Sequence, residues 1–139
     1  MLVYSPGVFD LLHVGHVRFL KAAKTYGTEL IVGIPTDEVV EQDKGKPPVF
    51  PLSHRMEMLK ALKCVDHVEP YYRLEFFTHL TYFEPDIVVV GEWGFEQRHR
   101  DLVEWTIMEG KQFVQLPRTE GISTTEIRKR IRCPHCPVS

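Results

Sequence analysis

The sequence lacks most features of extracellular, membrane and nucleic-acid-binding proteins. Its 139 residues include only three cysteines, too few for a disulfide framework in a chain long enough to build its own core. No apolar run has the length that spans a bilayer, and the first residues show no secretion signal. The formal charge is only −2, so no excess of one sign favours nucleic acid or an anionic membrane as a partner. We therefore expect a cytoplasmic protein.

Two common nucleotide-binding motifs are also missing. There is no G-x-x-x-x-G-K-[ST] and no G-x-G-x-x-G, so neither a P-loop kinase nor a dinucleotide dehydrogenase is supported. Cys133 and Cys136 have no second C-x-x-C with which to complete a structural zinc site, although His135 with a distant histidine or a second subunit remains an alternative. We expect a flexible tail over residues 133–139, after a single domain over residues 1–132.

The sequence does contain apolar runs of strand length that alternate with segments of helical spacing. The pattern predicts strands at 2–4, 29–34, 65–69, 87–91 and 112–116. It predicts helices at about 15–26, from 37, after 53, and at 74–83, 102–109 and 124–132. This alternation favours an α/β fold: one Rossmann-like domain with an open parallel sheet of about five strands and helices on both faces. The longest predicted loop, residues 42–52, is a candidate active-site flap.

Local signals place several helix ends. Thr36 and Ser53 are the expected N-caps of their helices, and Gly27 is expected just after the first helix. Ser123, with Glu126 three residues later, has the capping-box spacing. The aromatic segment 74–83 carries large side chains around most of its circumference, which favours one face in the core and another against a partner subunit.

The first strand runs through Gly7 into a helix that is expected to begin near His13. His13 and His16 then lie three residues apart on its first turn, beside free backbone N–H groups. Such a turn suits a phosphate, because the positive end of the helix dipole faces it. An isolated H-x-x-H pattern is more often a capping or core histidine beside a surface one. However, a glycine turn after a first strand is where open α/β sheets bind ligands.

A second phosphate-binding turn is predicted at the start of the last helix. Loops at the carboxyl ends of parallel strands meet in one crevice. Here those loops contain residues 7–16, 35–37, 92–98 and 118–125. Arg118 and the hydroxyls at 123–125 supply further donors, while Lys44 and Lys46 of the flap add positive charge.

These parts fit the transfer of a nucleotidyl group. The chain offers phosphate donors but no obvious nucleophile with its own base. The nucleophile would then be a phosphate oxygen of the acceptor, which is already deprotonated at neutral pH. The protein would align two anions and neutralise the charge that develops on the transferred phosphorus and on the leaving pyrophosphate.

The residues also resemble those of a known family. The chain is similar to the cytidylyltransferases of the nucleotidyltransferase superfamily marked by an H-x-G-H signature, and most similar among them to the glycerol-3-phosphate cytidylyltransferases. The resemblance covers nearly the whole chain. It is carried by residues 7–16 (GVFDLLHVGH), 36–38 (TDE), 44, 54–55 (HR) and 118–125 (RTEGISTT). The last of these motifs is the more specific.

The resemblance implies a role for each matched residue. It implies catalytic contacts with phosphates for His13, His16, Lys44 and Arg118. It implies nucleotide or anion binding for Gly7, Val8, Phe9, Arg55, Lys63, Glu92, Thr119, Ser123 and Thr124. It further implies Mg²⁺ accompanying CTP, release of pyrophosphate, and a homodimer. We expect no metal site built from protein ligands.

Three departures from the family pattern leave the acceptor and the base open. Val8 replaces the usual threonine and matches the heptose-phosphate nucleotidyltransferases. Lys63 replaces an arginine, which removes a bidentate fork. The segment Gly91-Glu92-Trp93 replaces G-D-D-W, so a carboxylate near the base or metal is moved. We expect the acceptor to be selected near residues 92–93 and the flap.

The leading hypothesis is an enzyme that transfers CMP from CTP to a small phosphorylated alcohol, with sn-glycerol 3-phosphate as the first candidate, giving a CDP-alcohol and pyrophosphate. An alternative within the same fold uses ATP with a sugar phosphate, FMN or a pantetheine phosphate, and the valine at position 8 mildly favours this alternative. A hypothesis of another class is a non-catalytic nucleotide- or metal-binding module with His13, His16 and the terminal cysteines as ligands.

Overall fold

The computed structural model describes residues 1–92, 96–119 and 121–132. The strands are β1 (Leu2–Pro6), β2 (Glu29–Pro35), β3 (His67–Tyr71), β4 (Ile87–Val90) and β5 (Gln112–Gln115). The helices are α1 (Val14–Lys24), α2 (Asp37–Lys44), α3 (Leu52–Lys60), α4 (Phe77–Phe83), α5 (Glu96–Met108) and α6 (Thr124–Arg132). The predicted tail at 133–139, with its cysteines, and Trp93 lie outside the described residues.

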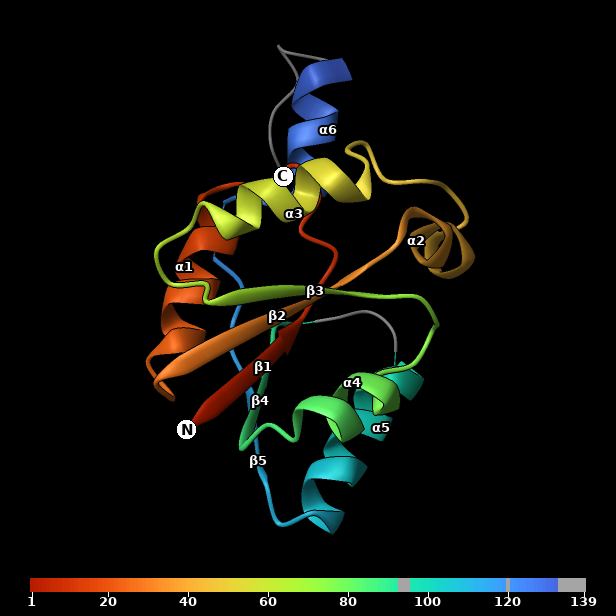
Figure 1. The fold of residues 1–139 in the computed structure, drawn as a ribbon. Helices are drawn as coiled ribbons and strands as arrows, with labels where there is room; N and C mark the ends of the chain where they lie inside the picture. Colours follow the sequence, from red (N-terminus) through yellow and green to blue (C-terminus); the bar gives the residue numbers. More distant parts are fainter. Residues whose placement is uncertain (93–95, 120, 133–139) are drawn as a thin grey trace.

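The strands form one parallel sheet in the order β3-β2-β1-β4-β5 (Figure 1). Val3 of the central strand is in register with Leu30 of β2 on one side and Ile87 of β4 on the other. The buried strands β1 and β4 are nearly all apolar, whereas the edge strand β5 is half exposed, as expected for a sheet covered on both faces. The predicted α/β fold with a five-stranded parallel sheet is confirmed.

Helices cover both faces of the sheet and enclose two apolar clusters. One cluster joins Val3 of β1 to Leu20 of α1 and Leu59 of α3. The other joins the neighbouring Tyr4 to side chains of α2, α4 and α5, such as Leu102. Successive residues of a strand point to opposite faces, so β1 is anchored in both clusters and its carboxyl end is held rigidly.

The helix after Thr36 is longer than predicted. Thr36 is its N-cap, as expected, and accepts the backbone N–H of Val39. The helix continues through Lys44 and stops at Gly45, whose φ of 78° is left-handed. The predicted flap at 42–52 was therefore too long, because nothing before Gly45 breaks the helix. Lys44 lies on a helical turn instead of a loop.

Other predicted boundaries also moved. Helix α3 begins at Leu52 after Pro51, so Ser53 lies inside the first turn and is not the N-cap. Helix α5 begins at Glu96, six residues before the predicted start at residue 102. Helix α1 ends at Lys24 instead of residue 26. Gly27 serves a close approach of two chain segments, because a Cβ there would lie 2.5 Å from the Met1 carbonyl.

Helix α4 divides its aromatic side chains between core and surface. Phe76, before its first residue, and Leu80 are buried, whereas Phe77 is 43% and Tyr82 80% exposed. One apolar face in the core is confirmed. The homodimer that would cover the outer face stays a prediction.

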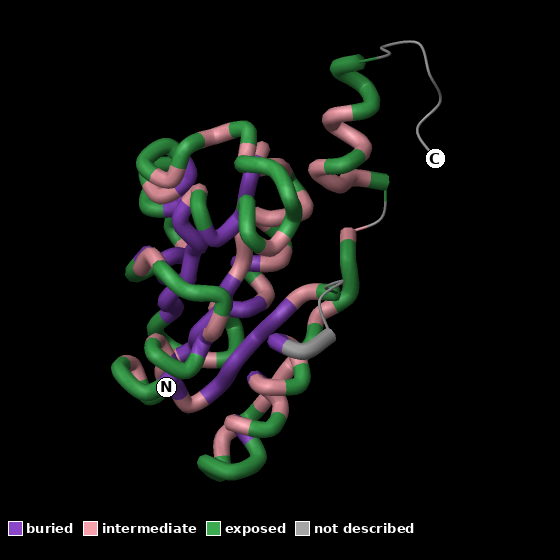
Figure 2. The backbone as a smooth tube through the Cα atoms, turned by 90° about the vertical axis from the view of Figure 1, so that its right-hand side faces the viewer, coloured by how far each residue is buried: buried purple, intermediate pink, exposed green. Residues whose placement is uncertain are grey.

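Helix α6 stands apart from the sheet and the helices that flank it (Figure 2), and none of its residues is buried. Thr124 in its first turn donates from its hydroxyl to the carbonyl of Asp10, 3.1 Å away. The first turn of α6 is thus fixed beside the loop that follows β1. Among the described residues, no helix has the length and apolar character to cross a membrane.

Candidate functional site

A pocket of about 400 Å³ opens at the carboxyl ends of the strands. Its described lining includes eleven of the thirteen residues singled out above as catalytic or binding. They are Gly7, Val8, Phe9, His13, His16, Lys44, Glu92, Arg118, Thr119, Ser123 and Thr124. Lys46 of the loop after α2 lies there as well. The sheet therefore brings together residues from both ends of the chain.

His13 and His16 cap the first turn of α1 with their ring nitrogens. The backbone N–H of Gly15 donates to Nδ1 of His13 at 3.0 Å, and the backbone N–H of His13 donates to Nδ1 of His16 at 3.2 Å. Because each Nδ1 accepts a hydrogen bond, the proton of each neutral ring must be on Nε2. Both rings are thus held as Nε2–H donors, which suits phosphate oxygens.

The environment keeps these two rings neutral. They stack with their centroids 3.8 Å apart, and Phe9 packs edge-on against His16 at 5.4 Å. The pKa of His16 is lowered to about 4, mainly by burial and further by His13, against an opposing effect of Asp10. Burial also lowers the pKa of His13. At neutral pH the free protein therefore presents two neutral donors.

Gly15 and Gly7 provide the space that this arrangement needs. A Cβ on Gly15 would lie 2.8 Å from the His13 ring, and one on Gly7 would lie 2.7 Å from the Phe9 ring. Phe9 and Leu11 adopt φ values of 52° and 50°, a left-handed conformation that costs a non-glycine residue of the order of 1 kcal/mol or more. The tight loop places the histidines at the end of β1.

The start of α6 forms the second side of the pocket. Ser123 caps the helix by accepting the backbone N–H of Glu126 at 3.1 Å, as the spacing predicted. Ser123 and Thr124 lie in the pocket lining with Arg118, so hydroxyl, guanidinium and free helix N–H donors meet there. We call the two histidines, Lys44, Arg118 and the first turn of α6 the phosphate clamp.

Lys44 contributes an ammonium group from an exposed side chain at the rim of the pocket. Its pKa is lowered, first by burial, and Arg128 and Arg98 lower it further while Asp43 and Asp10 oppose them. Such a crowd of cations in a protein of net charge −2 marks a local site for anions. A bound phosphate would favour the charged form of Lys44.

Asp10 organises the surroundings of the clamp and was missed by the sequence analysis. Its buried carboxylate accepts the backbone N–H groups of Leu11, Val49 and Phe50 at 2.7–3.2 Å. It also accepts Nη2 of Arg128 at 3.0 Å. One carboxylate thus joins the histidine loop, the loop at 45–51 and α6. One signal in the sequence pointed to this contact. Arg128 lies four residues after Thr124, so it shares a helix face with the Thr124 hydroxyl, which was expected at the pocket.

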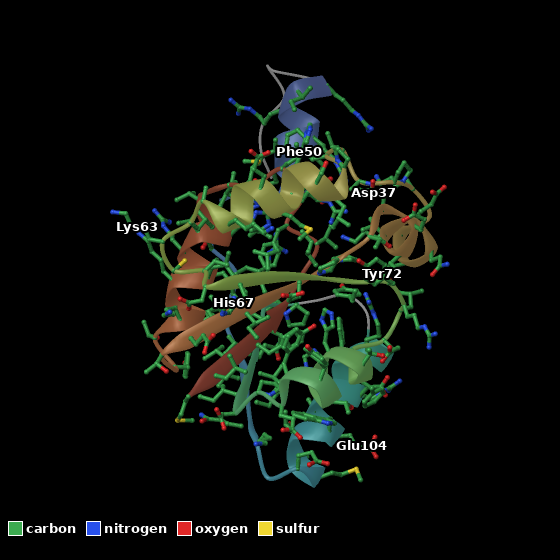
Figure 3. The ribbon with its side chains drawn as sticks, viewed as in Figure 1. Asp37, Phe50, Lys63, His67, Tyr72 and Glu104 are labelled. Carbon is green, nitrogen blue, oxygen red and sulfur yellow. The ribbon has the colours of Figure 1, made fainter. Side chains whose placement is uncertain are left out.

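Two predicted site residues lie elsewhere. Arg55 is 1% exposed, and its guanidinium donates to the carbonyls of Phe50 and Val8 and to Asp37 at 2.7–3.2 Å. It braces the backbone behind the pocket. Lys63 is exposed and absent from the pocket lining. Figure 3 shows it beyond the far end of α3, while Phe50 and Asp37 lie near the beginning of that helix.

Beyond the clamp, the pocket is lined by a cluster of aromatic side chains and an arginine that no sequence pattern indicated. Tyr71 and Phe76 pack edge to face with centroids 5.3 Å apart. The guanidinium carbon of Arg98 lies 5.0 Å from the Phe76 ring centre, and its Nη2 donates to Asp43 at 3.0 Å. We call Tyr71, Phe76 and Arg98 the aromatic wall.

Because the pKa of His16 is low, we predict that the free energy of unfolding depends on pH. Between about pH 4 and 6.5 the unfolded chain binds a proton at His16 and the folded chain does not, so stability rises with pH in this window and is lost as the pH falls. We expect His16→Asn, which has no titrating ring, to reduce this loss by about 2 kcal/mol. Urea unfolding at pH 4.5 and pH 7 measures it, and equal pH slopes in both proteins would contradict the assignment.

Comparisons with known proteins agree with this geometry. The family model described as cytidylyltransferase-like matches residues 4–130. An FAD synthase from Pyrococcus abyssi is 47% identical over 137 residues, which cover 93% of this chain and 90% of that protein. An ethanolamine-phosphate cytidylyltransferase from Arabidopsis thaliana is 35% identical over 134 residues, which cover 93% of this chain but 32% of that protein.

A solved structure has the same fold. It is the lipopolysaccharide core biosynthesis protein from Thermoplasma volcanium, with a TM-score of 0.75 and 28% identity. The match covers 86% of this chain and 98% of that one. The similarity thus extends over most of this chain and nearly all of the other.

Proposed function

The chain belongs to the cytidylyltransferase-like family and is a nucleotidyltransferase, and on this premise we propose that it transfers AMP from ATP to FMN, giving FAD and pyrophosphate. The similarity to the FAD synthase supports this choice, because it extends over 90% of that protein. By contrast, the cytidylyltransferase is matched over only 32% of its length.

The observation that carries the proposal is the extent of the pocket. Its lining continues beyond the clamp along apolar and aromatic side chains, among them Val40, Pro47, Tyr71 and Phe76. A small hydrophilic phosphoalcohol has almost no apolar surface to bury against such a lining. An acceptor with a large flat ring does, and FMN is the one among the weighed alternatives that carries it.

The reaction requires two anions to meet. A terminal phosphate oxygen of FMN attacks the α-phosphorus of ATP, a new P–O bond forms, and the bond from that phosphorus to the α,β-bridging oxygen breaks as pyrophosphate leaves. The Nε2–H groups of His13 and His16 donate to oxygens of the transferred phosphate. Arg118 and the first turn of α6 hold the departing phosphates, and Lys44 aligns the phosphate of the acceptor.

Mg²⁺ fits this scheme as an ion that the nucleotide brings. Magnesium is usually held by one or two carboxylates together with substrate phosphates. Glu92 is exposed at the pocket and is the carboxylate that would reach such an ion, whereas both oxygens of Asp10 already accept protein hydrogen bonds. Magnesium would neutralise charge on the β- and γ-phosphates.

A second candidate is transfer of CMP from CTP to a small phosphorylated alcohol, with glycerol 3-phosphate as the first acceptor to test. The 35% identity to an ethanolamine-phosphate cytidylyltransferase, over 93% of this chain, favours it. The phosphate clamp serves either nucleotide, so the two candidates differ in the base and the acceptor.

The deciding experiment measures pyrophosphate release with Mg²⁺ and each pair of substrates. We expect release with ATP and FMN, together with FAD identified by chromatography, and little release with CTP and glycerol 3-phosphate. ATP without an acceptor is the control for hydrolysis. Activity with CTP and an alcohol phosphate, and none with ATP and FMN, would establish the second candidate instead.

A further inference from the structure

We propose that the aromatic wall is the subsite for the flat ring of the acceptor, so that Arg98 and Phe76 select a heteroaromatic acceptor over a small phosphoalcohol. This inference rests on the proposed function for the identity of the ring, the isoalloxazine of FMN. It assigns the acceptor to the β2–β3 side of the pocket, next to residues of the predicted flap and away from residues 92–93, the other place where selection is expected from the sequence.

The wall is held in place before any ligand binds. The Arg98 guanidinium lies 5.0 Å from the centre of the Phe76 ring, and Asp43 holds it there through a 3.0 Å hydrogen bond. Arg98 is 9% exposed and Phe76 3%, so only small parts of these two side chains are open to the pocket and their positions are fixed by the surrounding protein. A preorganised surface of this kind loses little conformational entropy when a ligand binds.

The chemistry of the wall fits a ring with carbonyl groups at its edge. A guanidinium is planar and weakly hydrated, so it stacks on π-systems and donates hydrogen bonds in its own plane. Tyr71 adds a hydroxyl whose pKa burial raises to about 12, although the nearby Arg98 opposes the shift. That hydroxyl therefore stays protonated. A glycerol or ethanolamine phosphate offers neither a π-face nor a ring carbonyl to these groups.

The position of the wall fits an acceptor instead of the base of the nucleotide. Tyr71 ends β3, on the β2 side of the central strand, whereas Glu92, Arg118 and Thr119 follow β4 and β5 on its other side. The histidines lie between, at the end of β1. Acceptor and nucleotide would then approach the α-phosphorus from two sides, as an in-line displacement requires.

The last turn of α2 links the ring subsite to the phosphate of the acceptor. Asp43 holds Arg98, and the next residue, Lys44, lies in the pocket lining. Lys44 is close enough to Arg98 for its pKa to be affected. One molecule that carries both a ring and a phosphate would therefore contact Arg98, which Asp43 positions, and Lys44, which follows Asp43 in the same helical turn.

The test compares Arg98→Lys with Arg100→Lys. The Arg98→Lys substitution keeps a positive charge beside Asp43 but removes the planar guanidinium group. Arg100 is an exposed arginine of the same helix outside the pocket lining, so it is the matched control. For Arg98→Lys we expect KM for FMN to rise roughly tenfold, with kcat and KM for ATP changed less than twofold. We expect no change in either KM for Arg100→Lys.

Riboflavin, which has the ring without the phosphate, isolates the subsite. Quenching of its fluorescence measures binding to the wild type and each variant without any reaction. We expect riboflavin to compete with FMN but not with ATP, and to bind Arg98→Lys roughly tenfold more weakly. Tyr71→Phe, which keeps the ring and removes only the hydroxyl, provides a second variant if lysine at 98 disturbs folding, and we expect it to weaken riboflavin binding.

The outcomes separate the two proposals. If the wild type forms no FAD from ATP and FMN, the proposed function is wrong, whatever the variants do. If the wild type forms FAD but Arg98→Lys and Arg100→Lys share the same KM for FMN, the ring subsite is wrong. A rise confined to KM for ATP would also overturn it, because the wall would then hold the nucleotide.

Discussion

His16→Asn is expected to lower turnover about a thousandfold while leaving the fold intact. The asparagine oxygen takes the place of Nδ1 and can still accept the backbone N–H of His13, so the first turn of α1 keeps its cap. The variant lacks the Nε2–H donor that we propose contacts the transferred phosphate. Loss of one such donor to a developing charge typically costs two to three orders of magnitude. Steady-state pyrophosphate release measures kcat.

Two further variants test this interpretation. His16→Gln extends its amide towards the position of Nε2, so we expect it to recover about tenfold of the lost turnover relative to His16→Asn. His67→Gln is the control, because His67 is exposed at the edge of the sheet and pairs with Glu29. It should retain wild-type turnover. If His16→Asn turns over within a few-fold of the wild type, His16 does not act on the transferred phosphate.

Asp10→Asn is expected to lower the free energy of unfolding by about 3 kcal/mol. The carboxylate accepts four donors, two at each oxygen: Leu11 and Phe50 at Oδ1, Val49 and Arg128 at Oδ2. An amide has one oxygen, so in either orientation its NH₂ group faces two donors. Arg128 also loses its counter-charge, and breaking a buried ion pair on one side is costly. Urea unfolding measures the change.

Hydrogen exchange gives this prediction a local readout. The backbone N–H groups of Val49 and Phe50 should exchange faster in Asp10→Asn, since they lose their acceptor and the loop at 45–51 is released. Asp86→Asn is the matched control, because Asp86 is more exposed and accepts the backbone N–H of Leu2. It should cost less than about 1 kcal/mol. Equal destabilisation by both substitutions would contradict the organising role of Asp10.

Much of the candidate site followed from local signals and one rule of topology. The strand, glycine turn and helix of residues 2–16 are visible in the chain itself, as is the Ser123 cap. The rule that parallel strands end on one crevice then places His16 and Ser123 together, and both lie in the pocket lining. Neither step needs knowledge of how individual side chains pack.

The site residues that the sequence did not reveal are those whose hydrogen-bond partners lie far away in the chain. Asp10 bonds to Arg128, 118 residues away, and Arg98 to Asp43, 55 residues away. A sequence pattern carries no record of such pairs. Lys63 shows the converse case, because its position in the family pattern does not place its side chain in the pocket lining.

The sequence by itself determined the alternation of strands and helices, the parallel sheet, the two helix starts at the pocket and the class of chemistry, because each depends on periodicity, caps and spacing within short segments. Only the tertiary structure decided which donors face the pocket. It turned Arg55 inward as a brace, held both histidines as Nε2–H donors, and placed Arg98 on Phe76 beside Lys44. These features depend on contacts between segments that only packing brings together, and the last of them is the one proposed to select the acceptor.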